Sequence, residues 1–114
     1  MLSLPPSVRV FVATAPADLR KSFDGLAGLV RSGFSEDPLA GHIFVFIGRS
    51  GISVKILWWD RTGFAILHKK LSRGRFHVPK GPGPALRVDW PTLMLILEGI
   101  DLTHAKRRPH WSPS

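Results

Sequence analysis

The side chains of this sequence that could do chemistry are mostly basic, and they gather in one segment. Between residues 61 and 88 there are seven Lys and Arg and no Asp or Glu: Arg61, Lys69, Lys70, Arg73, Arg75, Lys80 and Arg87. The whole chain has 16 basic and 8 acidic residues, a formal net charge of +8. A field of one sign attracts a polyanion. We therefore expect nucleic acid as the partner; an acidic protein or an anionic membrane surface is the alternative.

The sequence lacks the groups that a metal-dependent enzyme needs. Nucleases and transposases with two metal ions require several carboxylates that converge on the ions, whereas turns and helix ends account for the acidic residues here. There are no cysteines, and the five histidines show no H-x-x-x-H or H-E-x-x-H spacing. A metal-free ribonuclease using His68 or His77 with Lys69 is conceivable, but no spacing specifies it. We predict a non-catalytic protein without metal or cofactor.

Three strands are expected to position the basic residues. They are rich in β-branched and aromatic residues and cover residues 43–47, 53–59 and 64–70. Gly-Arg-Ser-Gly and Asp-Arg-Thr-Gly sequences supply the turns between them. The strands therefore form an antiparallel meander. If Trp59 pairs with Phe64, the register places Lys55 opposite His68.

One face of this meander would have an aromatic end and a basic end. Side chains alternate between the two faces of a sheet, so Lys55, Leu57 and Trp59 share a side. If that side faces solvent it suits nucleic acid, because cations neutralise phosphates and rings stack on bases. The alternative is that Trp58 and Trp59 are packing residues and the lysines are a solvated face. The candidate DNA-binding residues are Lys55, Trp59, Lys69, Lys70, Arg73 and Arg75.

Two helices are expected to cover the meander. An apolar stripe of Leu19, Phe23, Leu26 and Val30 predicts a long N-terminal helix over about residues 16–32. A short strand over residues 85–88 precedes a second helix, with Asp89 as its N-cap, which runs through Glu98 and stops at Gly99. The predicted fold class is α+β: an antiparallel β-meander sheet packed against a long N-terminal helix and a short C-terminal helix.

The chain is expected to form one domain over residues 1–102, followed by a basic tail over residues 103–114. The tail contains Lys106-Arg107-Arg108 among Pro and Ser, which predicts a disordered electrostatic anchor. No apolar run approaches the ~20 residues that cross a membrane, and the N-terminus does not resemble a signal peptide. We expect a cytoplasmic protein that does not enter a membrane.

Several motifs, in this order and spacing, resemble the TnpB accessory proteins of the insertion-sequence family numbered sixty-six, also called Orf2-like. They are DLRKSFDGL (18–26), GHIFVFIGR (41–49), VKILWWDRTGF (54–64), KKLSRGRF (69–76) and ILEGID (96–101). The resemblance covers about residues 3–102. It departs from the family at Ser72, where Glu is usual, and at Val78, where Trp is common. The missing Trp removes one ring that could stack on a base.

The resemblance implies a bacterial mobile-element protein, encoded beside a separate DDE transposase and needed for efficient transposition. It carries over no catalytic residue. We therefore expect a non-catalytic accessory protein that binds DNA at the element ends. The candidate Lys and Arg would contact phosphates, and Trp59 would stack on an unpaired or distorted base. The alternative is a protein-interaction module that binds the transposase or the second accessory protein, through an exposed tryptophan or the apolar helix around residues 93–97, without contacting DNA.

Overall fold

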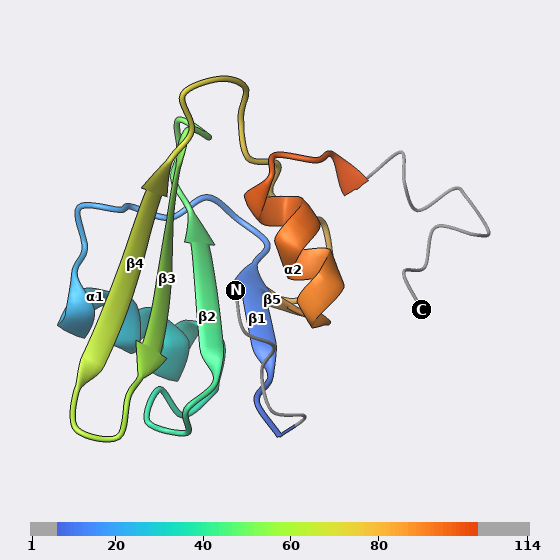
Figure 1. The fold of residues 1–114 in the computed structure, drawn as a ribbon. Helices are drawn as coiled ribbons and strands as arrows, with labels where there is room; N and C mark the ends of the chain where they lie inside the picture. The colour runs from blue at the N-terminus through green and yellow to red at the C-terminus, as the bar shows by residue number, and fades with distance from the viewer. Residues whose placement is uncertain (1–6, 103–114) are drawn as a thin grey trace.

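A mixed five-stranded β-sheet forms the centre of the computed structural model, which describes residues 7–102 (Figure 1). The strands are β1 (Val10–Ala13), β2 (Ile43–Ile47), β3 (Ser53–Trp59), β4 (Phe64–Lys70) and β5 (Ala85–Val88). They lie in the order β4-β3-β2-β1-β5. Strand β1 is parallel to β2, and the other neighbours are antiparallel. The helices are α1 (Phe23–Gly28), continued by the π-helical turn η1 (Leu29–Gly33), and α2 (Trp90–Leu97).

The antiparallel β2-β3-β4 meander and the predicted register of β3 with β4 are confirmed. Trp59 pairs with Phe64, and Lys55 pairs with His68. The turn between β2 and β3 has the backbone conformation that its glycine favours, since Gly51 has a φ of 78°. In the turn between β3 and β4 the positive φ, 54°, belongs to Arg61 and not to Gly63. Strand alternation and the positions of the turns were enough to place these strands.

Each face of the sheet packs against one helix (Figure 1), although no residue of β4 is fully buried and Leu67 is 40% exposed. One core joins the sheet to α1 and η1 through Phe11, Phe44, Phe46, Leu57, Leu26, Ala27 and Val30. The other joins it to α2 through Val12, Val45, Ile47, Val54, Ile56, Leu93 and Ile96. Burying an aliphatic or aromatic side chain contributes roughly 1.5–3 kcal/mol. The two cores hold the sheet from both sides, so functional surfaces are left at its ends and edges.

The expected antiparallel sheet is wrong because β1 is inserted between β2 and β5. The chain leaves β1, passes through α1 and returns to form β2 beside β1. A crossover of this kind returns the chain to the same end of the sheet, so β1 and β2 run parallel. Val10 is paired with Ile43 and Val12 with Val45.

The expected long N-terminal helix is also wrong. Ala17 lies in extended backbone beside β2, where its N–H donates to the carbonyl of Ile47 at 2.8 Å. Asp18 then accepts the N–H of Arg20 at 3.0 Å, a local bond that competes with helix formation. The helix begins only at Phe23, which is 45% exposed. Of the expected apolar stripe, only Leu26 and Val30 are fully buried.

The C-terminal helix follows its sequence signals. Asp89 accepts the N–H of Thr92 at 2.9 Å as the N-cap. Gly99 has a φ of 79° and donates to the carbonyl of Ile96, while Ile100 donates to that of Leu95. These are the two bonds of a Schellman motif. Ile96 itself is buried against the sheet, as is Leu93, so the apolar side of this helix is used by the core.

The described residues contain no helix with the length and apolar character needed to span a bilayer. The proposed tail over residues 103–114 lies outside the described part of the chain. Its disorder and its role as an anchor stay predictions.

Candidate nucleic-acid interface

The basic residues of the meander meet at one end of the sheet. Strand β2 ends there, the turn of residues 48–51 follows, β3 begins there and β4 ends there. This end is at the top of Figure 1. We call it the basic end and define it by Arg49, Lys55, His68, Lys70, Arg73 and Arg75.

A short loop holds two arginines at the basic end. The N–H of Leu71 donates to the carbonyl of Ile52 at 2.8 Å, and the N–H of Phe76 donates to that of Gly51 at 2.7 Å. These bonds fasten both sides of the Arg73–Arg75 loop to the turn between β2 and β3. Both arginine side chains are exposed. The loop therefore presents its guanidinium groups from a fixed base, although its sequence alone has no regular structure.

A hollow of about 380 Å³ lies next to the turn of residues 48–51, on the α1 side. Its polar lining comes from Arg20, Arg49, Ser50, Ser53 and His68, together with Asp18. Guanidinium, hydroxyl and imidazole groups are donors that suit a phosphate oxygen. The arrangement can hold a phosphate group beside the exposed arginines.

Asp18 is the acidic member of this lining, and it is already engaged. Its Oδ2 lies 2.8 Å from Nη2 of Arg20, and Nε of Arg20 also donates to its Oδ1 at 2.9 Å. These hydrogen bonds hold the pKa of the Asp18 carboxyl well below its usual range, with a smaller contribution from the charge of Arg49. The carboxylate stays charged near neutral pH, so the charge of Arg20 is offset, unlike that of the exposed loop arginines.

Two of the candidate lysines support the fold instead of extending into solvent. Nζ of Lys55 donates to the carbonyl of Lys21 at 3.0 Å and ties β3 to the segment that enters α1. Nζ of Lys69 donates to the carbonyl of Leu97 at 2.9 Å, on the α2 face of the sheet. This carbonyl belongs to the last turn of α2, where a cation is favourable.

Trp59 lies away from the basic end. It is four residues beyond Lys55 in the same strand, which corresponds to about 13 Å along a β-strand. Its ring packs edge-on against Phe64, with 5.1 Å between the ring centroids. The face that it shares with Lys55 is covered by α1, since Leu57 between them is fully buried. That face is not the open surface on which a duplex could lie.

The structure thus brings together four of the candidates: Lys55, Lys70, Arg73 and Arg75. It separates Lys69, which is on the other face, and Trp59, which is near the other end. Sequence reasoning missed Arg49 and Arg20. Arg49 could have been found from the predicted meander. The turn between β2 and β3 must lie at the same end of the sheet as the last residue of β4, so Arg49 lies beside Lys70. Arg20 could not, because its segment was expected to be helical.

The model of one protein family, described as IS66 Orf2 like protein, matches residues 8–107 of this chain. The chain belongs to the IS66 Orf2 like family. Two relatives from Sinorhizobium fredii (strain NBRC 101917 / NGR234) are similar to it along its whole length. The uncharacterized protein y4hO is 39% identical and the uncharacterized protein y4jC is 33% identical, each over 114 residues that make up 100% of this chain and 97% of the relative. No solved structure matches the chain.

Membership of the IS66 Orf2 like family makes the chain an accessory protein of an insertion sequence, and it confirms the resemblance drawn from the motifs. The family is one of transposition accessory proteins and is not known as catalytic. Among residues 7–102, no group of three or more His, Asp or Glu side chains is placed to hold a metal ion.

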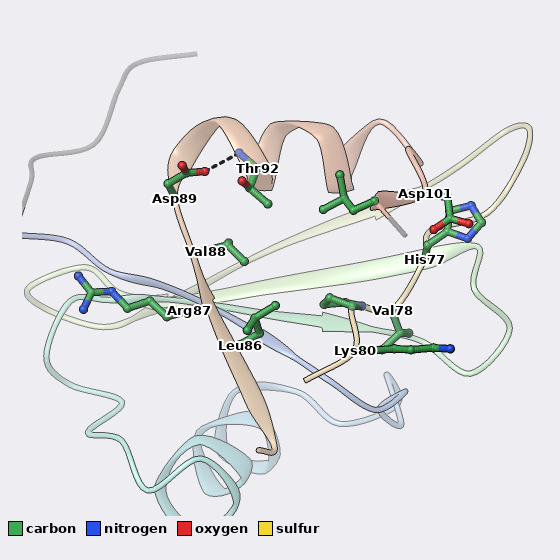
Figure 2. A pocket seen from close by; sticks show the side chains of 11 residues that line it. His77, Val78, Lys80, Leu86, Arg87, Val88, Asp89, Thr92 and Asp101 are labelled. Carbon is green, nitrogen blue, oxygen red and sulfur yellow. Dashed lines mark hydrogen bonds between the residues drawn. The ribbon is translucent and has the colours of Figure 1, made fainter. Parts of the chain in front are cut away.

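A second hollow of this IS66 Orf2 like protein lies beside β5, at the edge of the sheet opposite to β4. It has a volume of about 490 Å³ and is enclosed by β5, the start of α2 and residues 77–80 (Figure 2). Its apolar lining includes Val78, Leu86 and Val88. The edge strand β4 carries the basic end, and the edge strand β5 carries this hollow. The two surfaces lie over opposite edge strands, but His77, which lines the hollow, is two residues beyond Arg75, so the hollow approaches the basic end on this side.

Proposed function

We propose that this accessory protein of an insertion sequence binds duplex DNA at the element ends through the basic end of its sheet. The observation that carries the proposal is the fastening of the Arg73–Arg75 loop to the turn of residues 48–51 by two backbone hydrogen bonds. This arrangement gathers Arg49, Lys70 and the two loop arginines on one exposed surface. The protein would act in the cytoplasm, where the DNA of the element is found.

Free charge at this surface supports phosphate contacts. Lys70, Arg73 and Arg75 are exposed and make no ion pair or side-chain hydrogen bond with the other described residues. Their charges are therefore available to a phosphate backbone, and guanidinium groups bind phosphate oxygens in a bidentate way. Such contacts position a protein on DNA without reading its sequence. Preference for the element ends would come from DNA shape or from the transposase.

We assign Lys55 and Lys69 supporting roles because their ammonium groups already donate to carbonyls. Trp59 belongs to the aromatic end and has no part in the proposed phosphate surface. The alternative of a module that binds only proteins has less support from α2, since Leu93 and Ile96 of this helix are in the core. The transposase and the second accessory protein of the element remain proposed partners in the same assembly.

Fluorescence anisotropy with a labelled duplex from the element end tests the proposal. Arg73→Ala/Arg75→Ala should weaken binding at least tenfold. It should also make the slope of log affinity against log salt shallower by about 1.8, because each phosphate contact contributes about 0.9 to the steepness of that slope. Arg9→Ala/Arg31→Ala is the matched control, since it removes two exposed arginines outside the basic end. It should change affinity less than about threefold.

An equal loss of DNA affinity in the two double variants would mean that binding depends on net charge and not on the basic end. A wild-type protein that fails to bind any duplex at low salt would contradict the proposal itself. A scrambled duplex measured alongside gives the sequence preference.

A further inference from the structure

The hollow at the β5 edge is not needed by the fold or by the proposed DNA surface. Figure 2 shows Leu86 and Val88 on β5, with Val78 and Lys80 on the neighbouring segment and Asp89 and Thr92 at the start of α2. Lys80, Asp89 and Asp101 also line it, whereas the side chain of Arg87 points away from Leu86 and Val88 in Figure 2. The hollow therefore has an apolar floor beside the last strand of the sheet, and Arg87 lies on the other face of that strand.

The backbone of β5 is open on its outer side. The N–H of Thr14 donates to the carbonyl of Pro84, and residues 10 to 13 continue the same antiparallel register along β5. Hydrogen-bonded pairs alternate along such a ladder, so the backbone groups of residues 86 and 88 face β1. Those of Ala85 and Arg87 face outwards, where no strand among residues 7–102 pairs with them.

The side chains of β5 alternate in a way that specifies a complementary strand. Leu86 and Val88 lie on the α2 face and line the hollow, whereas Arg87, paired with Phe11, lies on the α1 face. Side chains directly opposite one another on neighbouring strands interact. An added strand would therefore match β5 best if apolar residues alternated with acidic ones.

The charge on the outer edge of β5 also bears on the choice of ligand. Asp89 and Asp101 line the hollow together with Lys80, and the backbone N–H bond to Asp89 leaves its charge in place, but the charged residue of β5 itself is Arg87. Lys80 and Arg87 are exposed and have no hydrogen bond or ion pair within the described part of the chain. Residues 103–114 of this chain contain three Lys or Arg and no acidic residue, so their charge does not suit a strand placed opposite Arg87.

We propose that this groove binds an extended segment of a partner protein in which apolar and acidic residues alternate, and that the segment adds a sixth strand to the outer edge of β5. Main-chain hydrogen bonds to Ala85 and Arg87 would give affinity, and the apolar floor would select alternate side chains. DNA does not fit as well, because a phosphate backbone offers nothing apolar to Leu86 and Val88. The edge of β5 is opposite to β4 in the sheet, so the accessory protein could hold a protein and DNA at once.

The test uses a fluorescein-labelled octapeptide in which Glu alternates with Val, and a control peptide with Lys in place of Glu. Anisotropy measures binding to the full chain, and ¹H–¹⁵N correlation spectra locate it. The Glu peptide should bind and shift the amides of residues 85–88, and the Lys peptide should bind at least tenfold more weakly. Equal binding of the two peptides, or no shift at β5, would overturn the proposal.

Two variants separate the charges from the strand edge. Lys80→Glu/Arg87→Glu should weaken binding of the Glu peptide at least tenfold and strengthen binding of the Lys peptide. Ala85→Pro removes one outward N–H at the first residue of an edge strand, a position that tolerates Pro. This variant should also bind the Glu peptide more weakly. Unchanged unfolding midpoints would show that both variants fold.

Three outcomes would identify a different occupant and overturn the proposal. Peptide-induced shifts at the basic end would mean that the Glu peptide only mimics DNA. Loss of duplex binding in Lys80→Glu/Arg87→Glu would make the groove part of a nucleic-acid surface. A dimer in sedimentation that dissociates on Ala85→Pro would place a second copy of this chain at β5. Unchanged peptide binding in Arg73→Ala/Arg75→Ala keeps this test independent of the proposed DNA function.

Discussion

Adjacent residues of one strand have different roles in this protein, as Lys69 and Lys70 show. Alternation along β4 sends Lys69 to the α2 face and Lys70 to the α1 face. The ammonium of Lys69 is half-buried and donates to the last turn of α2. The side chain of Lys70 is exposed at the basic end. The sequence KK gives no sign of this difference, which depends on where the helix lies.

Substituting each lysine by Met tests this division at the residue scale. Lys69→Met removes a charged hydrogen bond at a helix C-terminus and should lower the free energy of unfolding by about 1 kcal/mol. Lys70→Met removes an exposed charge and should change it by less than about 0.5 kcal/mol. Urea denaturation measures both.

DNA affinity should rank the two variants in the opposite order, with the larger loss in Lys70→Met. If Lys69→Met were the weaker DNA binder while retaining full stability, Lys69 would be a contact residue and the assignment made from its hydrogen bond would be wrong.

At the scale of elements, local signals were predictable and long-range ones were not. The β2-β3-β4 register follows from turn residues and alternation within 28 residues, 43–70. The parallel pairing of β1 with β2 depends on a crossover that no local pattern encodes. The segment from residue 17 to residue 22 shows the conflict directly: its apolar spacing favours a helix, but Ala17 is bound to the end of β2 and Asp18 to Arg20. Tertiary contacts override the helical period there.

The ion pair between Asp18 and Arg20 should make the stability of the folded protein depend on pH. The folded-state pKa of Asp18 is lowered below its ordinary value of 3.8. The ion pair therefore stabilises the fold above pH 3.8, and this stabilisation is lost as the pH falls towards the folded-state pKa. Asp18→Asn should therefore be less stable than wild type at pH 7. The difference should shrink below pH 4, measured by urea denaturation across a pH series.

Arg20→Ala provides the matched background for this experiment. Without the guanidinium, Asp18→Asn should no longer have a pH-dependent effect. A difference between Asp18→Asn and wild type that is as large at pH 3 as at pH 7 would show that the carboxylate charge does not hold the segment.

At the scale of the whole molecule, the sheet is covered on both faces and open at both edges. The expected candidate surface was a face of the meander, but α1 covers it and leaves Leu57 fully buried. The candidate residues that remain exposed, Lys70, Arg73 and Arg75, are at the end of β4 and in the adjoining loop, while the apolar groove is at β5. Composition predicted a polyanion partner from +8 of net charge. Only the packing shows which of the basic residues remain available to it.

The proposed contact between duplex DNA and the basic end can be measured by a ¹H–¹⁵N correlation titration of the labelled protein with the element-end duplex. We expect the largest shifts at the amides of residues 49–51 and 70–75, and little change at residues 85–88. Shifts spread evenly over the surface, or concentrated at β5, would contradict it.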